Sequence, residues 1–121
     1  MKLSLIEDNG QHTKISITGP ITQREFLPLQ EPLSEVLMGN AFSRPVLLDL
    51  SEVTHVDSSG IGWMLACHKQ LRQAGGKFII HSCPPLFTSV AKVLRLEQIL
   101  EIAPDAKAAV ESANILKGVV A

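Results

Sequence analysis

The chain has 121 residues, about the length of one ordinary domain, and we expect residues 1–121 to form one. Hydrophobic residues make up 45% of the chain and charged residues 19%, which excludes a disordered, highly charged polypeptide. The formal net charge of −1 argues against a nucleic-acid-binding surface, which usually carries a clustered basic excess.

Neither export nor a metal site is indicated. The first eight residues turn acidic too early for a signal peptide, and no apolar run approaches the ~18 residues of a membrane span. Cys67 and Cys83 match no zinc-binding spacing, so we interpret them as small buried apolar residues. We therefore expect a cytoplasmic protein with reduced thiols and with no metal or cofactor of its own.

The first elements form a predicted hairpin. Hydrophobic and polar residues alternate over residues 3–7 and again over 13–19, which is the period of a β-strand. Asp8-Asn9-Gly10-Gln11 between them is typical of a turn. We expect Gly19-Pro20 to end the second strand, because proline cannot donate a hydrogen bond to the neighbouring strand.

Residues 22–38 carry apolar side chains at helical spacing, but two prolines interrupt the pattern. A proline inside a helix costs roughly 3 kcal/mol, so one continuous helix is not expected. We predict a loop followed by a helix over residues 32–39, with Pro32 in its first turn.

The middle of the chain predicts a buried strand followed by a long helix. Residues 45–50 are almost continuously apolar, as in a strand covered on both faces, and residues 51–56 are interpreted as a bend. Residues 58–74 predict the clearest helix. Its expected apolar face consists of Ile61, Met64, Leu65, His68 and Leu71. Gly75-Gly76 is expected to end it, since glycine adopts the left-handed cap conformation at low cost.

The last third predicts two more strands and two more helices. Residues 77–81 form a buried strand, Pro84-Pro85 opens a helix, and a short strand lies near Leu100 and Ile102. The expected inner face of the helix consists of Phe87, Val90, Val93 and Leu94. A final helix follows Pro104-Asp105. The alternation predicts an α/β fold: a mixed sheet of about five strands with helices mainly on one face.

Asp57-Ser58-Ser59-Gly60 lies between a strand and the strongest helix, which is the segment where we expect the function. The first backbone N–H groups of a helix lack partners within it, and the helix dipole adds partial positive charge there. Asp57 suits the N-cap position, which makes Ser58 and Ser59 the first helical residues. A phosphate on Ser58 would add roughly −1.5 to −2 charge at a place that tolerates an anion.

Neighbouring residues extend this predicted site. Gly60 and Gly62 have no side-chain bulk, so the backbone of another protein could approach them closely. Trp63 lies off the predicted apolar face, and we expect it to line the partner surface with Ser58 and Ser59. The alternative is that Trp63 packs against a neighbouring helix.

Catalysis by Ser58 is not expected. A hydrolase would need a histidine such as His55 or His81 within hydrogen-bond reach of the serine. The nucleophile-elbow pattern Gly-x-Ser-x-Gly is absent, because Val56 stands where its first glycine belongs. The chain also lacks a phosphate-binding loop with its lysine.

Segments between Leu47 and Ile102 resemble the STAS domain of anti-sigma factor antagonists. The matching pieces are Leu47-Leu48-Asp49-Leu50-Ser51, Val56-Asp57-Ser58-Ser59-Gly60-Ile61-Gly62, Gly75-Gly76, Phe78-Ile79-Ile80 and a helix from Pro85 to Leu96. In that family the serine directly after the motif aspartate, here Ser58, is phosphorylated. The resemblance implies a non-enzymatic regulator of transcription that binds an anti-sigma factor, itself an ATP-binding serine kinase. A PP2C-type phosphatase reverses the modification.

The sequence departs from the family at two places that bear on function. Thr22 stands where many members carry an aspartate, and Arg95 replaces the usual glycine before Leu96. The missing acid favours an alternative, in which the domain is a scaffold or allosteric interaction module that is not phosphorylated. The sequence leaves open which pathway is involved and whether the chain forms a homodimer.

Overall fold

The computed structural model describes residues 2–22 and 43–120, with side chains as far as residue 113. Its elements are β1 (Lys2–Asp8), β2 (Thr13–Ile21), β3 (Pro45–Val56), α2 (Ser58–Gln73), β4 (Lys77–His81), α3 (Pro85–Leu94), the 3-10 turn η3 (Leu96–Gln98), β5 (Glu101–Ala103) and α4 (Ala106–Val120). The helix predicted for residues 32–39 lies outside the described residues.

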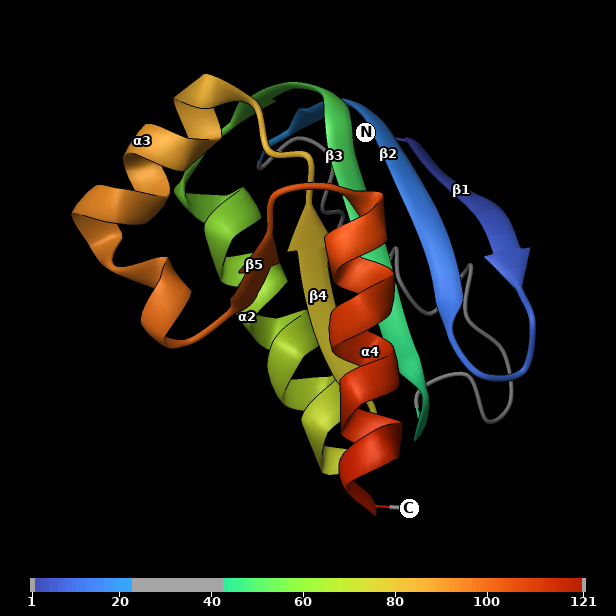
Figure 1. Ribbon diagram of the computed structural model, residues 1–121. Coiled ribbons are helices and arrows are strands. Elements are labelled where there is room, and N and C mark those ends of the chain that lie inside the picture. The colour runs from blue at the N-terminus through green and yellow to red at the C-terminus, as the bar shows by residue number, and fades with distance from the viewer. Residues whose placement is uncertain (1, 23–42, 121) are drawn as a thin grey trace.

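The five strands form one mixed sheet in the order β1-β2-β3-β4-β5 (Figure 1). β1 pairs antiparallel with β2, and β2, β3, β4 and β5 run parallel to one another. Parallel neighbours need crossover connections, which α2 and α3 provide after β3 and β4. This arrangement confirms the predicted fold class.

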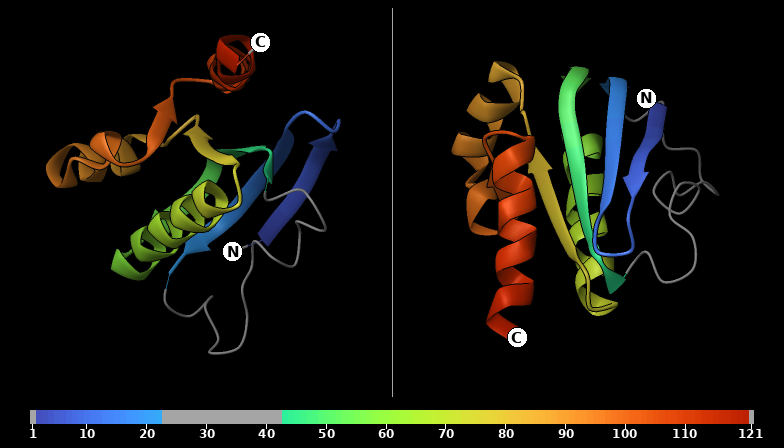
Figure 2. Two further views of the ribbon diagram at one scale, coloured as in Figure 1. Left: turned by 90° about the horizontal axis from the view of Figure 1, so that it is seen from below. Right: turned by 45° about the vertical axis from the view of Figure 1, so that its right-hand side comes forward.

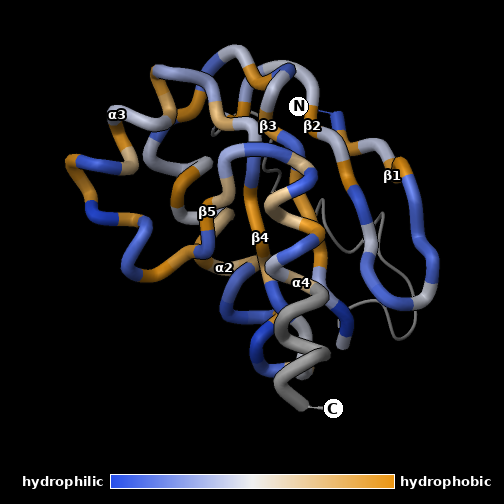
Figure 3. The backbone as a smooth tube through the Cα atoms, viewed as in Figure 1, coloured by the Kyte–Doolittle hydropathy of each residue, from blue (hydrophilic) through white to orange (hydrophobic). Residues whose placement is uncertain are grey.

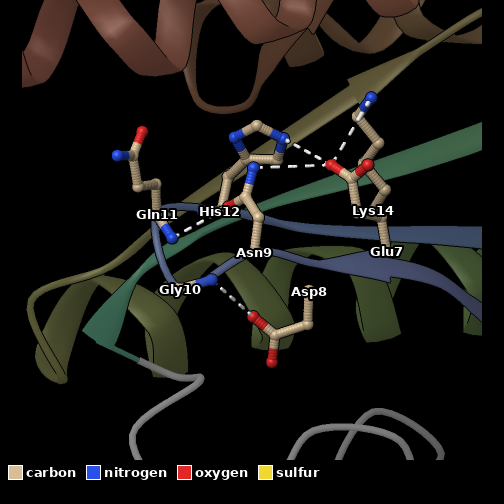
Figure 4. Close-up of polar contacts among 7 residues, drawn as sticks. All are labelled: Glu7, Asp8, Asn9, Gly10, Gln11, His12 and Lys14. Atoms are coloured by element: carbon tan, nitrogen blue, oxygen red, sulfur yellow. Dashed lines mark hydrogen bonds and ion pairs between the residues drawn. The ribbon is translucent and has the colours of Figure 1, made fainter.

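The β1–β2 turn is held by polar contacts around one carboxylate (Figure 4). Glu7 Oε1 lies 3.5 Å from His12 Nε2 and 3.9 Å from Lys14 Nζ, and it accepts a hydrogen bond from Asn9 Nδ2 at 3.4 Å. Asn9 Oδ1 accepts hydrogen bonds from the backbone N–H groups of Gln11 and His12, both at 2.9 Å. The asparagine therefore acts as the predicted turn residue, since its side chain replaces missing backbone partners.

Two predicted strand ends are wrong, and the errors have one cause. β2 continues through Pro20 to Ile21, and β3 continues to Val56 instead of bending after Leu50. The pairing of β2 with β3 shifts register between Gly19 and Pro20. A proline is tolerated at such an irregularity because no regular ladder bond is lost there. Beyond the shift Ile21 pairs with Val56, so both strands end together.

The helices lie on the two faces of the sheet (Figure 2). α2 and α3 share the larger apolar cluster, which includes Leu48, Met64, Ile80 and Phe87. α4 covers the opposite face, where the smaller cluster consists of Leu47, Ile79, Ala103, Ala109 and Ala113. β4 is buried from both sides, and its central residues are strongly hydrophobic (Figure 3). Two of the three described helices therefore lie on one face, in line with the prediction.

Helix α2 begins and ends as predicted, but its buried face differs. Gly75 has a φ of +89° and follows the last turn of the helix. The buried residues of α2 are Gly60, Ile61, Trp63, Met64, Cys67 and Leu71. Leu65 and His68, which were predicted for this face, are only partly buried. The buried face of α2 is therefore rotated relative to the predicted one, toward the side of the helix that carries the small residues Gly60 and Cys67.

The predicted inner face of α3 is also partly wrong. Phe87 is buried, but Val93 is 81% exposed and Leu94 is 52% exposed. The chain reverses directly after Leu94, because Arg95 adopts a left-handed conformation with φ 54° and ψ 41°. Leu96, in η3, is then buried in the core instead. The apolar spacing of α3 therefore reflects two faces of the helix, of which one is solvent-exposed.

The start of α2 lies directly against the end of β2. A Cβ atom added to Gly60 would lie 2.4 Å from the backbone oxygen of Ile21 and 2.9 Å from Val56 Cγ1. No side chain other than hydrogen fits at that distance from a backbone atom. Gly60 therefore sets how closely the helix start approaches the sheet.

We expect Arg95→Gly to stabilise the protein by about 1 kcal/mol. A non-glycine residue in the left-handed conformation is strained, whereas glycine adopts it readily at a helix C-terminus. Arg95 is exposed, so little packing is lost. Urea unfolding at fixed pH measures the change, and Arg95→Ala, which keeps the strain, should not stabilise. Equal stabilisation by both variants would contradict this explanation.

We expect Gly60→Ala to destabilise the protein by about 1–3 kcal/mol, because the added methyl group collides with a backbone atom that cannot move freely. Gly62 is the matched control in the same helix, since nothing lies within 4 Å of a Cβ added there. Gly62→Ala should stabilise by up to about 1 kcal/mol through helix propensity. Thermal melting of both variants tests the pair, and similar melting temperatures would refute the close-approach argument.

Candidate functional site

Asp57 fixes the turn between β3 and α2 through hydrogen bonds of its side chain and its backbone. Its side-chain Oδ1 accepts from the N–H of Gly60 at 3.0 Å, the geometry of an N-cap. Its own N–H donates to the carbonyl oxygen of Ile21 at 3.2 Å, and its carbonyl oxygen accepts from the N–H of Ile61 at 3.1 Å. Asp57 therefore joins the end of β2 to the first turn of the helix.

Ser58 and Ser59 are the first two residues of α2, as predicted. Ser58 is exposed and Ser59 is half-buried. The first N–H groups of a helix have no carbonyl partner within the helix. Here the N–H groups of Gly60 and Ile61 donate to the side-chain and carbonyl oxygens of Asp57. The turn thus presents an accessible hydroxyl beside backbone donors at the positive end of the helix dipole.

The two glycines of the motif differ in their surroundings. Gly62 is exposed, and the space around it is open, as expected for a point where another protein could approach. Gly60 is buried. Its lack of a side chain serves the close approach of Ile21 within the same chain, so it is not the open approach point that the sequence suggested.

Trp63 does not lie on the surface. Its exposed fraction is 7%, and it belongs to the main apolar cluster with Met64 and Cys67. The expectation that Trp63 lines an exposed partner face is therefore wrong, because the side chain is buried in the core. The reason is the rotated buried face of α2, which brings position 63 to the edge of the core.

The surface beside Ser58 continues onto β3 and α3. Thr54 and His55, just before the turn, are exposed, and Leu86 in the first turn of α3 is 59% exposed. A small cleft of about 20 Å³ lies between these segments. It is lined by Val53, Thr54, His55, Val56, Pro84, Leu86, Phe87 and Val90. The sequence signal for this neighbourhood is that α3 carries more apolar residues than one buried face requires.

His81 and Cys83 lie at the end of β4, and burial controls both of their pKa values. Burial lowers the pKa of His81, opposed by the nearby charges of Asp49 and Asp105. The His81 Nδ1 atom lies 2.9 Å from the hydroxyl oxygen of Ser82. Burial raises the pKa of the Cys83 thiol to about 11, so the thiol stays protonated at neutral pH.

Two absences apply to the part of the chain that the structure describes. Within it, no group of three or more histidine, cysteine, aspartate or glutamate side chains is placed to hold a metal ion. Among the same residues, no helix combines the length and apolar character needed to cross a membrane.

Comparison with known structures gives the same fold at low sequence identity. An anti-sigma factor antagonist from Mycobacterium paratuberculosis is 20% identical, with a TM-score of 0.74 over 93% of this chain and 95% of that chain. An anti-sigma-factor antagonist (STAS) domain protein from Planctomyces limnophilus is 21% identical, with a TM-score of 0.74 over 94% and 99%. The anti-sigma factor antagonist SpoIIAA in its unphosphorylated form is 15% identical, with a TM-score of 0.60 over 96% and 98%. At these identities the likeness shows the fold alone.

Comparison with protein families gives the more specific result. The family model described as "Mlab, STAS domain" matches residues 4–101. The match begins in β1 and ends at the first residue of β5, so it spans the parallel strands β2, β3 and β4 and the turn that carries Ser58. The chain therefore belongs to the STAS domain family.

Proposed function

We propose that this protein is an anti-sigma factor antagonist-like regulator that binds a serine kinase and is switched by phosphorylation of Ser58. The observation that carries the proposal is an exposed serine at the first position of a capped helix. Membership of the STAS family and the fold of the three antagonists support it.

The turn around Ser58 suits a modification that changes binding without changing the fold. The backbone there is fixed by Asp57, which accepts from the N–H groups of Gly60 and Ile61 and donates to the carbonyl oxygen of Ile21. A phosphate on Ser58 would project from the exposed side of the turn, near helix N–H groups that favour an anion. The same phosphate would add about two negative charges to any interface docked on this surface.

The proposed partners follow from this role. An ATP-binding serine kinase that also holds a sigma factor would dock on the turn and modify it, and a PP2C-type phosphatase would restore the serine. The nucleotide and the metal ions of these reactions would be held by the partners. Cytoplasmic localisation belongs to the same proposal.

One observation favours a second function, a scaffold or allosteric module that is not phosphorylated. Thr22 directly follows Ile21, whose carbonyl oxygen accepts the hydrogen bond from Asp57, so residue 22 is adjacent to the turn. Many family members carry an aspartate at this position. A threonine removes a negative charge that a kinase could recognise, while the docking surface itself remains.

We expect Ser58→Asp to weaken binding to the kinase-like partner by about 1–3 kcal/mol, because it places an unpaired charge in the docked interface. Ser58→Ala should bind like the unmodified protein and resist modification. Neither variant should lose much stability, since a helix start accepts an anion. The measurement is calorimetry against the partner recovered by pulldown from the native cell, together with thermal melting.

Mass spectrometry after incubation with that partner and ATP separates the two proposed functions. Phosphate on Ser58, and none in Ser58→Ala, supports the switch. Phosphate found only on Ser59 would contradict the assignment of the modified residue. A partner that binds but never modifies the protein, in buffer with ATP and magnesium, would support the scaffold instead.

We expect Gly62→Arg to weaken partner binding at least about tenfold while leaving the protein folded, because the arginine adds bulk at an open position on the same side of the turn. Arginine is also a better helix former than glycine, so the melting temperature should not fall. The control is Gln73→Arg, which adds the same side chain at the far end of α2. Gly75→Arg is not used as a control because Gly75 has a positive φ, which an arginine would adopt only with strain. Equal affinities for both variants would place the partner elsewhere.

A further inference from the structure

A cleft of about 300 Å³, here called the Arg72 cleft, lies at the opposite end of α2 from Ser58. It is bounded by the second half of α2, the start of β4 and the segment that leads from η3 into β5. Its lining residues are His68, Arg72, Gly76, Lys77, Phe78, Ile99 and Glu101. Sites for small molecules begin near ≈ 300 Å³, so this cleft reaches the size that the small cleft beside Ser58 lacks.

The charged side chains of the Arg72 cleft do not balance one another. Lys77 Nζ lies 2.5 Å from Glu101 Oε1, and Glu101 Oε2 accepts a hydrogen bond from the hydroxyl of Ser112. Glu101 is the only carboxylate among the described residues that line the cleft, and both of its oxygens are engaged. Arg72 is exposed and forms no ion pair with any residue that the structure describes. Its positive charge is therefore uncompensated, although the chain as a whole has a formal net charge of −1.

This excess charge favours one kind of anion. The guanidinium of an arginine presents its N–H donors in a planar fork that matches a carboxylate or a phosphate. A carboxylate balances the single charge of Arg72, whereas a phosphate monoester, with roughly −1.5 to −2 charge, would leave negative charge beside Glu101. The C-terminal end of a helix also disfavours anions, so the affinity has to come from Arg72 itself. The cleft is thus matched to a monocarboxylate.

The remaining lining residues favour an apolar body on that carboxylate. Phe78 is only 1% exposed, whereas Ile99 is 53% exposed and would lose apolar contact with water under a ligand. His68 lines the same cleft, and its Nδ1 atom is shielded from solvent without a hydrogen-bond partner among the described residues. A shielded polar atom without a partner costs free energy, so a ligand group that hydrogen-bonds to the ring would recover part of that cost.

We infer that the Arg72 cleft binds a small organic monocarboxylate, whose carboxylate pairs with Arg72 and whose apolar body packs against Phe78 and Ile99. The inference goes beyond the proposed function and does not depend on it. At a rise of about 1.5 Å per residue, Arg72 lies roughly 20 Å along α2 from Ser58. A small ligand in the cleft therefore does not reach the turn that carries Ser58.

The test is an NMR titration of the ¹⁵N-labelled protein with two probes, 3-phenylpropionate and hexanoate. We expect at least one of them to shift the backbone amide signals of Gly76, Lys77 and Ile99 in a saturable way. The matched neutral ligands, 3-phenylpropionamide and hexanamide, should bind at least about tenfold more weakly, because they lack the charge that pairs with Arg72. Equal affinity for acid and amide would overturn the inference. So would the absence of saturable shifts up to about 10 mM, well above a weak Kd of about 1 mM.

A pair of substitutions locates the bound probe. Arg72→Gln should weaken binding of the carboxylate at least about tenfold, because it removes the charge and keeps a polar side chain. Lys92→Gln is the matched control, since it removes one positive charge from a groove of similar size, about 330 Å³, beside α3. Both residues are exposed, so thermal melting should show folded variants. Equal losses in the two variants, or a loss in Lys92→Gln alone, would overturn the assignment to the Arg72 cleft.

Two further outcomes would also overturn the inference. Phenyl phosphate that binds more tightly than both carboxylates would contradict the class of ligand. Shifts confined to residues 57–61 would place the anion at the start of α2, where the helix dipole favours it. In every one of these cases the proposed function stands, because its own tests use the kinase-like partner and variants of Ser58.

Discussion

The carbonyl oxygen of Ile21 is the point on which the arrangement of the site depends. It accepts a hydrogen bond from the N–H of Asp57, and it lies so close to Gly60 that no Cβ atom fits between them. The hydrogen bond and the missing side chain together hold the start of α2 against the end of β2. Ser58 and Ser59 lie between these two contacts in the chain, and Ser58 is left exposed. Their position is thus determined by the packing of their neighbours.

A site built in this way separates stability from recognition. The side chain of Asp57 caps the helix, and Gly60 provides the close approach, so both are required by the fold itself. Ser58 and Gly62 are exposed, and the fold does not require their side chains in the same way. Evolution can therefore change residues on the outer side of the turn without unfolding the domain. A departure such as Thr22 is informative about partners for this reason, because it alters the charge beside the turn and leaves the contacts of Ile21 in place.

Sequence periodicity predicted most of the helices and strands. It failed where a strand end or the burial of a side chain depends on residues far away in the chain. The turn chemistry of residues 8–11, the ends of α2 and the proline start of α3 are local, and each was predicted correctly. The continuation of β2 past Pro20 depends on a register shift against β3, which no local pattern records. The burial of Trp63 and the exposure of Val93 depend on how each helix is rotated against the sheet. Small residues such as Gly60 weigh little in a hydrophobicity pattern, yet they determine that rotation.

A rim position is physically suited to a reversible switch. An apolar centre supplies affinity that does not depend strongly on charge, whereas rim charges change the association rate and its salt dependence. A phosphate at the edge needs to change the affinity only by a coupling energy of 1–3 kcal/mol, or roughly 5–150-fold, which is the usual range of regulatory effects. Ser58, exposed in the first turn of α2, is suited to such an edge position.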